Sequence, residues 1–425
     1  MAPESRGIAG ATRYVAANGL VALIQRNPSA PTVSVRGEVQ VGAVHETASQ
    51  NGLAAFTGAA LIRGAGERTF QQIVAETEER GCSVNAGGGL HTTGFAGKAL
   101  VEDLPLILAI LADMLARPTF PPHEVEKLRG QFLNALRESE QETSTQAWRA
   151  ARALLYPSEH PYSRLTSGTI ETVQALMRED LLRFHQLYHP AATTVAIVGD
   201  VEPEAVIATL ESSLGAWPPV GPPPGLDLPP VPPLNAALRR DVPMSGKIQS
   251  DVVWAVHGLR RTDPDYYPAM MANMILGRLG IGGRLGENVR EEQGMAYYCY
   301  SNLDADVGAG PWSAVAGVNP ANVERAIEAL LHEVARFVAE GPTEQEVSDA
   351  RDYLTGSLVL SLETNDGIAA ALLAIERFGL GLDFIERYPA IIGAVTGDQI
   401  ADAARRYLST ERYVLAVAGP PAENS

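Results

Sequence analysis

Two histidines near the middle of the chain have a spacing that could hold a metal ion. His185 and His189 lie four residues apart in RFHQLYH, within a segment whose pattern predicts a helix, so both imidazoles would share one helical face. No acidic residue lies between them, and a matching segment 219 positions later has the apolar Ala404 and Leu408 in their places. A structural or surface role is therefore favoured over a metal site.

Other catalytic patterns are weak. His91, His160, His257 and His332 stand alone in the sequence, and each is better explained by local hydrogen bonding than by catalysis. The chain has no G-x-S-x-G elbow, although a Ser-His-Asp arrangement assembled from distant segments stays open. The glycine-rich stretch 277–285 lacks the G-K-[ST] ending of a phosphate loop, which disfavours nucleotide binding.

Composition narrows the class of protein. The 425 residues are 46% hydrophobic and 20% charged, with a mean hydropathy of −0.02, which is typical of a folded chain with a sizeable core. Lys and Arg number 33 against 50 Asp and Glu, so the net charge is −17 and the isoelectric point about 5.0. Because this negative charge repels phosphate backbones and anionic lipids, neither nucleic acid nor a membrane is expected as a partner.

The two cysteines and the start of the chain bear on its compartment. Cys82 and Cys299 are far apart and lack C-x-x-C spacing, so neither a disulfide framework nor a cysteine zinc site is indicated, while a single bridge stays open. No apolar run approaches the roughly 20 residues that span a bilayer. The first six residues contain no apolar signal core. A cytoplasmic protein is expected, or a periplasmic one if a signal peptide has been removed.

A proline-rich stretch divides the chain into two halves. Nine of the 29 prolines fall between Pro218 and Pro233, in a segment that favours extended polyproline geometry. We predict a linker over 218–235, preceded by one unit over 1–217 and followed by a second unit over 236–425.

Helical segments recur in both halves. The segment His123–Leu136 follows two prolines and matches Gln345–Leu358, which follows another, at an offset of 222. The segment Val173–Tyr188 matches Ile392–Tyr407 at an offset of 219. A broad apolar helical surface is also predicted over Tyr266–Gly280. The repeat predicts two units with a shared fold.

Strands complete the repeat. The segments 19–27 and 32–43 read as strands, the second with valines at even spacing on one buried face, and 250–259 reads as their counterpart. Short apolar strands, 196–199 and 416–419, follow the last predicted helix of each half. The predicted fold class is α+β, with two homologous units that each cover a mixed or antiparallel sheet with helices and are joined by the proline-rich linker.

A resemblance to a known family enters at residues 41–70, VGAVHETASQNGLAAFTGAALIRGAGERTF. This stretch resembles the opening of the pitrilysin/insulinase-type metallopeptidases, which include the mitochondrial processing peptidase, where a G-L-A-H-x-x-E-H helix carries two zinc ligands and a general base. The corresponding positions here are Ala55, Gly58 and Ala59. Zinc needs about three protein ligands, so the resemblance implies that the unit over 1–217 is peptidase-like with a degenerate metal motif, which has lost its metal ligands and its base.

A further zinc ligand of the family is a glutamate on a later helix. Glu138 occupies a similar place here, and seven residues earlier, where the family commonly has another glutamate, the chain has Gln131. One carboxylate cannot hold zinc. A solvated helix charge is therefore the favoured interpretation of Glu138, and no metal ligand or other cofactor residue is predicted in this chain.

The second half carries another family motif. The segment Asn288–Tyr297, NVREEQGMAY, resembles R-E-x-x-G-L-A-Y, from which an arginine and a tyrosine seven residues apart bind substrate and stabilise the oxyanion. The resemblance implies these roles for Arg290 and Tyr297. Taken locally, Arg290 could instead pair with Glu291 or Glu292, and Tyr297 could simply begin an aromatic strand. The agreement of both halves with the family favours the catalytic roles.

The unequal retention of the two motifs indicates a division of labour. It resembles a two-chain bacterial peptidase in which one subunit carries zinc and the other the Arg/Tyr element. The expected partner is a zinc-binding chain of similar size with H-x-x-E-H, and the expected substrate is an unfolded peptide bound as an extended strand. This chain would be inactive alone. The alternative is a catalytically silent scaffold or a peptide-presenting subunit of the same fold.

Overall fold

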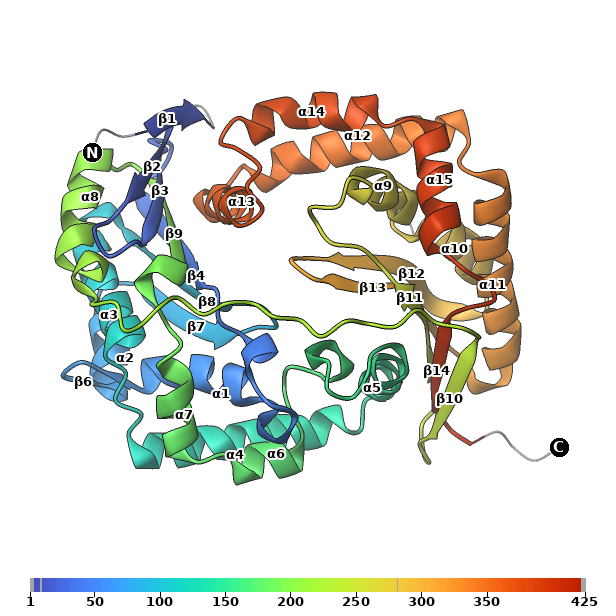
Figure 1. Ribbon diagram of the computed structural model, residues 1–425, viewed down its shortest axis with the longest axis horizontal. Helices are drawn as coiled ribbons and strands as arrows, with labels where there is room; N and C mark the ends of the chain where they lie inside the picture. The colour runs from blue at the N-terminus through green and yellow to red at the C-terminus, as the bar shows by residue number, and fades with distance from the viewer. Residues whose placement is uncertain (1–3, 8–9, 281, 422–425) are drawn as a thin grey trace. The chain divides into compact units, whose positions relative to one another are not determined.

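A computed structural model describes residues 4–7, 10–280 and 282–421 of the chain (Figure 1). These residues form two compact units that are interleaved along the sequence. Unit 1 draws on Met1–Leu136, Leu165–Asp227 and Val359–Arg387, and unit 2 on Arg137–Arg164, Leu228–Leu358 and Tyr388–Ser425. The boundaries predicted at 217 and 236 follow the sequence repeat, whereas each compact unit also contains a segment from the opposite half.

Unit 1 is built on a mixed sheet. Neighbouring strands are antiparallel except β3 (Val21–Arg26) and β9 (Thr193–Gly199), which are parallel. The described strands run in the order β1 (Glu4–Gly7), β2 (Ala11–Val15), β3 (Val21–Arg26), β9 (Thr193–Gly199), β4 (Thr32–Val39), β8 (Thr93–Leu100) and β7 (Ser83–Gly88). Strand β7 therefore lies at one edge of this sheet.

Helices cover both faces of the unit 1 sheet. In β9, Val195 and Ile197 face the main core, whereas Ala196 and Val198 pack with Ala369 on the opposite face. Because both faces are buried, every residue of β9 is apolar, small or a threonine. The main core lies under α1 (Leu53–Ala60), α2 (Phe70–Glu79), α3 (Leu104–Ala116), α4 (Pro122–Ser139), α7 (Arg178–His185) and α8 (Pro203–Ser212), and the opposite face under α13 (Asn365–Arg377).

Unit 2 repeats this topology. Its described strands run in the order β10 (Leu238–Pro243), β14 (Val414–Gly419), β11 (Ser250–His257), β13 (Ala309–Val318) and β12 (Ala296–Ala305). Only β10 and β14 among these are parallel, as β3 and β9 are in unit 1. Edge strand β12 thus corresponds to β7. The predicted pair of similar units with mixed sheets is confirmed.

The unit 2 sheet is also covered on both faces. Val252, Trp254 and Trp312 face a core formed with α9 (Tyr266–Gly277), α11 (Val323–Glu340), α12 (Glu344–Ser361) and α15 (Gly397–Tyr407). The other face of β11 and β14 carries α5 (Thr143–Leu155) (Figure 1). Helix α5 comes from the first half of the sequence.

Helices α5 and α13 are exchanged between the halves of the sequence, because each covers the sheet formed mainly by the other half. The bounds of α4 and α5 recur as those of α12 and α13 after a shift of 222 residues, the offset found in the sequence. Helix α5 packs on the sheet of unit 2, while α13 packs on β9 and β4 of unit 1. The Arg36 guanidinium on β4 forms two hydrogen bonds with Asp366 on α13, 2.6 and 2.7 Å long.

The repeated segments Val173–Tyr188 and Ile392–Tyr407 are each predicted to be one helix, but each overlaps two helices in the structure. The first contains α6 (Ile170–Ala175) and α7, and the second overlaps α14 (Phe384–Ala394) and α15. Local capping explains both breaks: Asp180 accepts a hydrogen bond from the Met177 amide at 2.7 Å, and Thr396 accepts one from the Gln399 amide at 3.2 Å. The proline-rich stretch 218–233 contains neither helix nor strand.

Among the described residues, no single helix is long and apolar enough to cross a bilayer. One pair, α12 with α13, passes the test jointly, but the two helices are bent by 115°.

Candidate functional site

A buried carboxylate fixes the start of α1, the helix on which the family carries its metal motif. Glu46 accepts hydrogen bonds from Asn51 Nδ2 at 2.9 Å and from the amides of Gly52 and Ala54 at 3.0 and 2.9 Å. Gly52 adopts φ +98°, a left-handed conformation that favours glycine. The Glu46 carboxylate therefore accepts hydrogen bonds from backbone amides at the start of α1 that have no partner within the helix.

The metal-motif face of α1 is packed against edge strand β7. A Cβ at Gly58 would lie 2.2 Å from the Gly88 amide nitrogen, and a Cβ at Gly88 would lie 2.0 Å from the Ala54 carbonyl oxygen. Both contacts are with backbone, so neither can be relieved by turning a side chain. Ala55 and Ala59 are half-buried on the same helix. Position 58 consequently has no room for the glutamate that would act as a base.

The residues of α4 do not complete a metal site. Gln131 Oε1 accepts a hydrogen bond from Arg63 Nη2 at 2.8 Å, and Arg63 Nη1 lies 3.5 Å from Glu124 Oε2. A fixed guanidinium thus stands beside position 131, where it disfavours a divalent cation. Glu138 lies exposed near the end of the helix. Within the described ranges, no three His, Cys, Asp or Glu side chains are grouped so that they could hold a metal ion.

The histidine pair is engaged in structural contacts. His185 Nε2 lies 2.8 Å from the Leu115 carbonyl oxygen, and burial lowers the pKa of this imidazole. His189 Nδ1 accepts a hydrogen bond from the Ala191 amide at 3.0 Å. These contacts agree with the structural role that the sequence favours.

Arg290 lies on a short π-helix, η8 (Gly286–Glu292), that is fastened to unit 2. Leu285 and Val289 are buried in the core, and Asn288 Nδ2 donates to Glu333 Oε1 at 2.5 Å. Glu333, on α11, is fully buried and also accepts from Arg336 at 2.7 Å. Helices of the π type are rare and occur often at functional sites, so the backbone under Arg290 is both unusual and well anchored.

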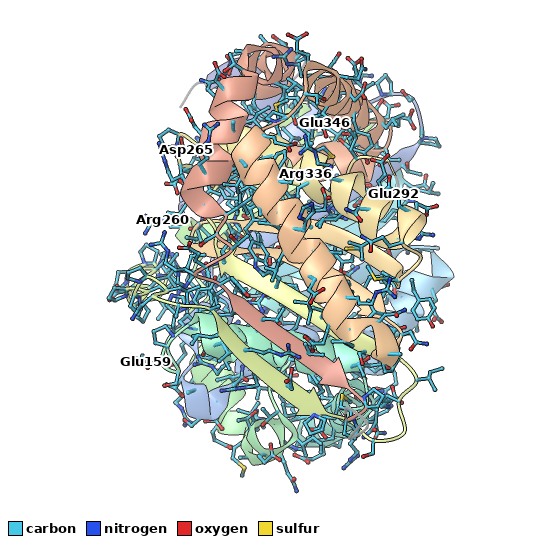
Figure 2. All side chains as sticks on the ribbon, turned by 90° about the vertical axis from the view of Figure 1, so that its right-hand side faces the viewer. Glu159, Arg260, Asp265, Glu292, Arg336 and Glu346 are labelled. Carbon is cyan, nitrogen blue, oxygen red and sulfur yellow. The ribbon has the colours of Figure 1, made fainter. Side chains whose placement is uncertain are left out.

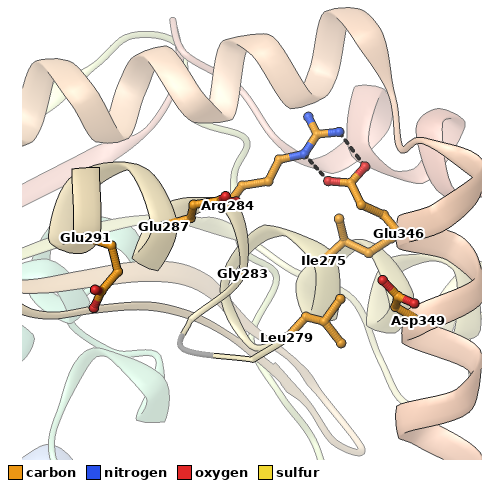
Figure 3. Close-up of a pocket in the computed structure, with 8 residues that line it drawn as sticks. All are labelled: Ile275, Leu279, Gly283, Arg284, Glu287, Glu291, Glu346 and Asp349. Atoms are coloured by element: carbon orange, nitrogen blue, oxygen red, sulfur yellow. Dashed lines mark hydrogen bonds and ion pairs between the residues drawn. The ribbon is translucent and has the colours of Figure 1, made fainter. Parts of the chain in front are cut away.

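An ion pair holds the segment just before η8. Arg284 forms two hydrogen bonds with Glu346 on α12, 2.5 and 2.7 Å long (Figure 3). It donates a third to the Gly341 carbonyl oxygen at 3.0 Å. Burial alone would raise the pKa of Glu346, but the hydrogen bonds from Arg284 lower it below its ordinary value. The carboxylate is therefore ionised at neutral pH and neutralises the charge of Arg284. Both residues line a pocket of about 350 Å³ that Glu287 and Glu291 of η8 also border.

The Arg290 side chain itself is at the surface. Its Nε lies 3.5 Å from Glu291 Oε1, and the two side chains are 43% and 52% exposed. An ion pair of this length and exposure is worth little, so it does not hold the guanidinium away from a ligand. Glu292, at the end of the same helix, also lies at the surface of unit 2 (Figure 2). The local alternative to a catalytic role is thus present but weak.

Tyr297 sits on a β-bulge. Ala296 pairs with Val318 and Tyr298 with Gly317, so Tyr297 is an extra residue in edge strand β12. Its side chain is 60% exposed. Bulges re-aim side chains and are common beside active sites. Arg290 and Tyr297 therefore lie on consecutive elements of unit 2, both exposed and both on irregular backbone, although within the described residues no hydrogen bond joins them.

Several residues that shape these two regions are absent from the sequence predictions. They are Glu46, Arg63, Asp251, Arg284 and Tyr298. The sequence does contain a signal for Asp251, because a charged residue is unusual within the otherwise apolar strand segment SDVVWAV. The hydrogen-bond partners of Arg63, Arg284 and Tyr298 lie 47 or more residues away along the chain, and only the contacts of Glu46 are local.

Most of the chain matches known protein families in sequence. The profile described as "Insulinase (Peptidase family M16)" matches residues 21–160, and the one described as "Peptidase M16 inactive domain" matches residues 175–354. Together they cover about three quarters of the chain. The chain belongs to peptidase family M16.

M16 relatives match along most of their length. An uncharacterized zinc protease of Streptomyces coelicolor is 26% identical over 423 residues, covering 97% of this chain and 90% of the relative. The uncharacterized zinc protease YmxG of Bacillus subtilis is 23% identical, with 96% and 98% covered. A probable mitochondrial-processing peptidase subunit beta of Schizosaccharomyces pombe is 26% identical, with 83% and 79% covered.

Solved M16 structures share the fold. A peptidase M16 inactive domain from Pseudomonas fluorescens superposes with a TM-score of 0.89 at 23% identity, covering 98% of this chain and 99% of that one. A protease from Helicobacter pylori gives 0.88 at 16% identity, with 99% and 100% covered. The predicted resemblance to the insulinase-type peptidases and the predicted fold class are confirmed.

Proposed function

We propose that this chain is the non-metal-binding subunit of a heterodimeric zinc metallopeptidase, to which it contributes Arg290 and Tyr297. The observation that carries the proposal is the packing of Gly58 against the backbone of β7, which leaves no space for a catalytic base. The metal, its ligands and the base would then come from a partner chain of similar size with H-x-x-E-H.

The residues of this chain would act on the substrate carbonyl. As a peptide bond is hydrolysed, its oxygen gains negative charge, and donors aimed at that oxygen stabilise the transition state. The Arg290 guanidinium and the Tyr297 phenol are both donors, and both are exposed to a ligand. The first also offers a permanent positive charge, and the second a directional hydrogen bond.

Two further observations support a role in a larger peptidase. The π-helix and the bulge place both side chains on well-held, irregular backbone, which a simple scaffold does not need. Relatives named as beta subunits of the mitochondrial processing peptidase are, by that name, parts of a multi-subunit enzyme. A two-chain assembly is therefore a reasonable expectation for this protein.

The first experiment tests division of labour. The purified chain is assayed with unfolded peptides, alone and mixed with a zinc-binding M16 chain from the same genome, and bound zinc is measured by mass spectrometry. We expect neither zinc nor hydrolysis for the chain alone, and both in the mixture. Peptide hydrolysis by the isolated chain would refute the proposal.

The second experiment tests the arginine. Arg290→Ala should lower kcat of the mixture by roughly a hundredfold, the effect of removing one oxyanion donor, while the two chains still co-elute. Arg325→Ala, which removes an exposed arginine from α11, is the matched control and should leave kcat unchanged. Equal kcat for Arg290→Ala and the wild type, with the zinc chain active only in the complex, would instead favour a silent scaffold.

A further inference from the structure

A buried carboxylate at the centre of the unit 2 sheet lies outside the roles assigned so far. Asp251, on the middle strand β11, is only 1% exposed. Its oxygens accept hydrogen bonds from three neutral donors: Thr143 Oγ1 at 2.5 Å, Gln249 Nε2 at 3.2 Å and the Tyr298 hydroxyl. Burying a carboxylate is costly unless its hydrogen bonds are satisfied, so these three bonds define its orientation.

The hydrogen bond from Tyr298 crosses an entire strand. Asp251 on β11 and Tyr298 on β12 are each paired with Gly317 on the intervening strand β13. A Cβ at Gly317 would lie 2.4 and 2.6 Å from the Tyr298 ring and 2.8 Å from Gln249 Nε2. The glycine therefore leaves the space in which the tyrosine ring lies across β13 and reaches the acid.

This cross-strand bond ends at the bulge. Tyr298 is the residue that resumes pairing after the extra residue Tyr297. Burial and, after it, the hydrogen bond to Asp251 raise the pKa of the Tyr298 phenol, so it remains a hydrogen-bond donor at neutral pH. An edge strand has a hydrogen-bonded neighbour on one side only, so fewer backbone bonds fix its register than fix that of an inner strand. The hydrogen bond from Tyr298 to Asp251 on the middle strand adds a further restraint on the register of β12.

We propose that Asp251 is a positioning residue for Tyr297: by holding Tyr298 across Gly317, it fixes the register of the bulge and thereby the place of the Tyr297 phenol. The inference rests on the proposed function, because it gives the position of Tyr297 a catalytic consequence. Thr143, the first residue of α5, extends the arrangement, since it orients the second oxygen of the same carboxylate.

Three variants test whether the hydrogen bond between Asp251 and Tyr298 positions Tyr297. Tyr298→Phe keeps the ring and removes only the hydroxyl, whereas Asp251→Leu removes both acceptors. Asp251→Asn keeps one oxygen to accept from Tyr298. If position rather than charge matters, the asparagine variant should behave like the wild type and the other two should not.

The test uses the complex of this chain with its zinc-binding M16 partner and measures kcat and KM separately. Tyr298→Phe and Asp251→Leu should each lower kcat about fivefold or more with KM within about twofold, because a displaced phenol is lost from the transition state rather than from substrate binding. Asp251→Asn should restore kcat to within about twofold of the wild type. Tyr300→Phe, on the same strand, is the matched control and should change neither constant.

The outcomes separate the two proposals. Tyr297→Phe is measured alongside and should lower kcat by more than any of these variants. If it does, while Tyr298→Phe leaves kcat at the wild-type value, the positioning role is overturned and the proposed function stands. If Tyr297→Phe itself has no effect, the proposed function fails and the positioning role fails with it. Amide hydrogen exchange over 296–300, measured on the chain alone, should rise in Tyr298→Phe if the bulge is released.

Discussion

The packing of α1 against β7 predicts that the metal motif cannot be restored by substitution. Even the smallest change, Gly58→Ala, places a Cβ 2.2 Å from the Gly88 nitrogen, where ordinary contacts begin at 3.4 Å. The helix or the strand must move by more than about 1 Å to relieve this contact. Such overpacking costs about 3 kcal/mol at the upper end, and alanine recovers about 1 kcal/mol of helix propensity.

A net loss of about 2 kcal/mol is therefore expected for Gly58→Ala, which lowers the melting temperature of unit 1 by about 4–8 °C. Thermal unfolding measures this shift. Gly87→Ala is the matched control, because a Cβ at Gly87 meets nothing within 4 Å. Equal stability of the two variants would show that α1 and β7 are not packed as described.

The same reasoning extends to the full motif. In a triple variant with Ala55→His, Gly58→Glu and Ala59→His, the glutamate is larger than the alanine that already fails to fit, so the variant should be less stable than Gly58→Ala. It should also bind less than one zinc per chain. Measurement by mass spectrometry of one tightly bound zinc in a stably folded triple variant would refute the packing argument.

Three further predictions concern contacts described above. Arg284→Met leaves Glu346 without its ion partner and should destabilise unit 2 by up to about 3 kcal/mol, with faster amide exchange over 286–292; unchanged exchange there would contradict the anchoring role. Glu46→Gln replaces an acceptor with a donor at the start of α1 and should cost about 1–3 kcal/mol in urea unfolding, whereas a neutral result would mean that other groups cap the helix. The Arg36 guanidinium lowers the pKa of Asp366, so this pair stabilises the fold above the unfolded-state pKa of about 3.9 and loses its effect as the pH falls through the lower folded value. Protection factors of the amides over 365–377, which compare each exchange rate with its intrinsic rate at the same pH, should therefore fall between pH 5 and pH 3, and less so in Asp366→Asn; equal falls in both proteins would contradict the role of the pair.

The fold was largely predictable from the sequence because its main features are periodic. The offset of 222 residues reproduces the bounds of α4 and α12 without adjustment. The apolar strands and the proline-rich linker follow from local composition. What the repeat could not reveal is which sheet each helix covers, because that choice depends on tertiary packing and not on local pattern.

The candidate sites divide in the same way. Ala55, Gly58 and Ala59 cannot bind metal by their side-chain chemistry alone, and this is readable from the sequence. That Gly58 is also pressed against a neighbouring backbone requires coordinates, because the contact joins residues 30 positions apart. The bulge at Tyr297 has no sequence signature either, since it arises from how β12 pairs with β13.

The exchange of α5 and α13 has a consequence for how this protein can be divided. A fragment ending at the proline-rich linker would keep α5 without the strands it covers, and its own sheet would lack α13 over β9 and β4. Each half on its own would expose an apolar sheet face, so neither is expected to be a stable product of limited proteolysis or truncation. Reciprocal exchange of equivalent segments is also what a domain-swapped homodimer would show after two copies of its gene were fused end to end.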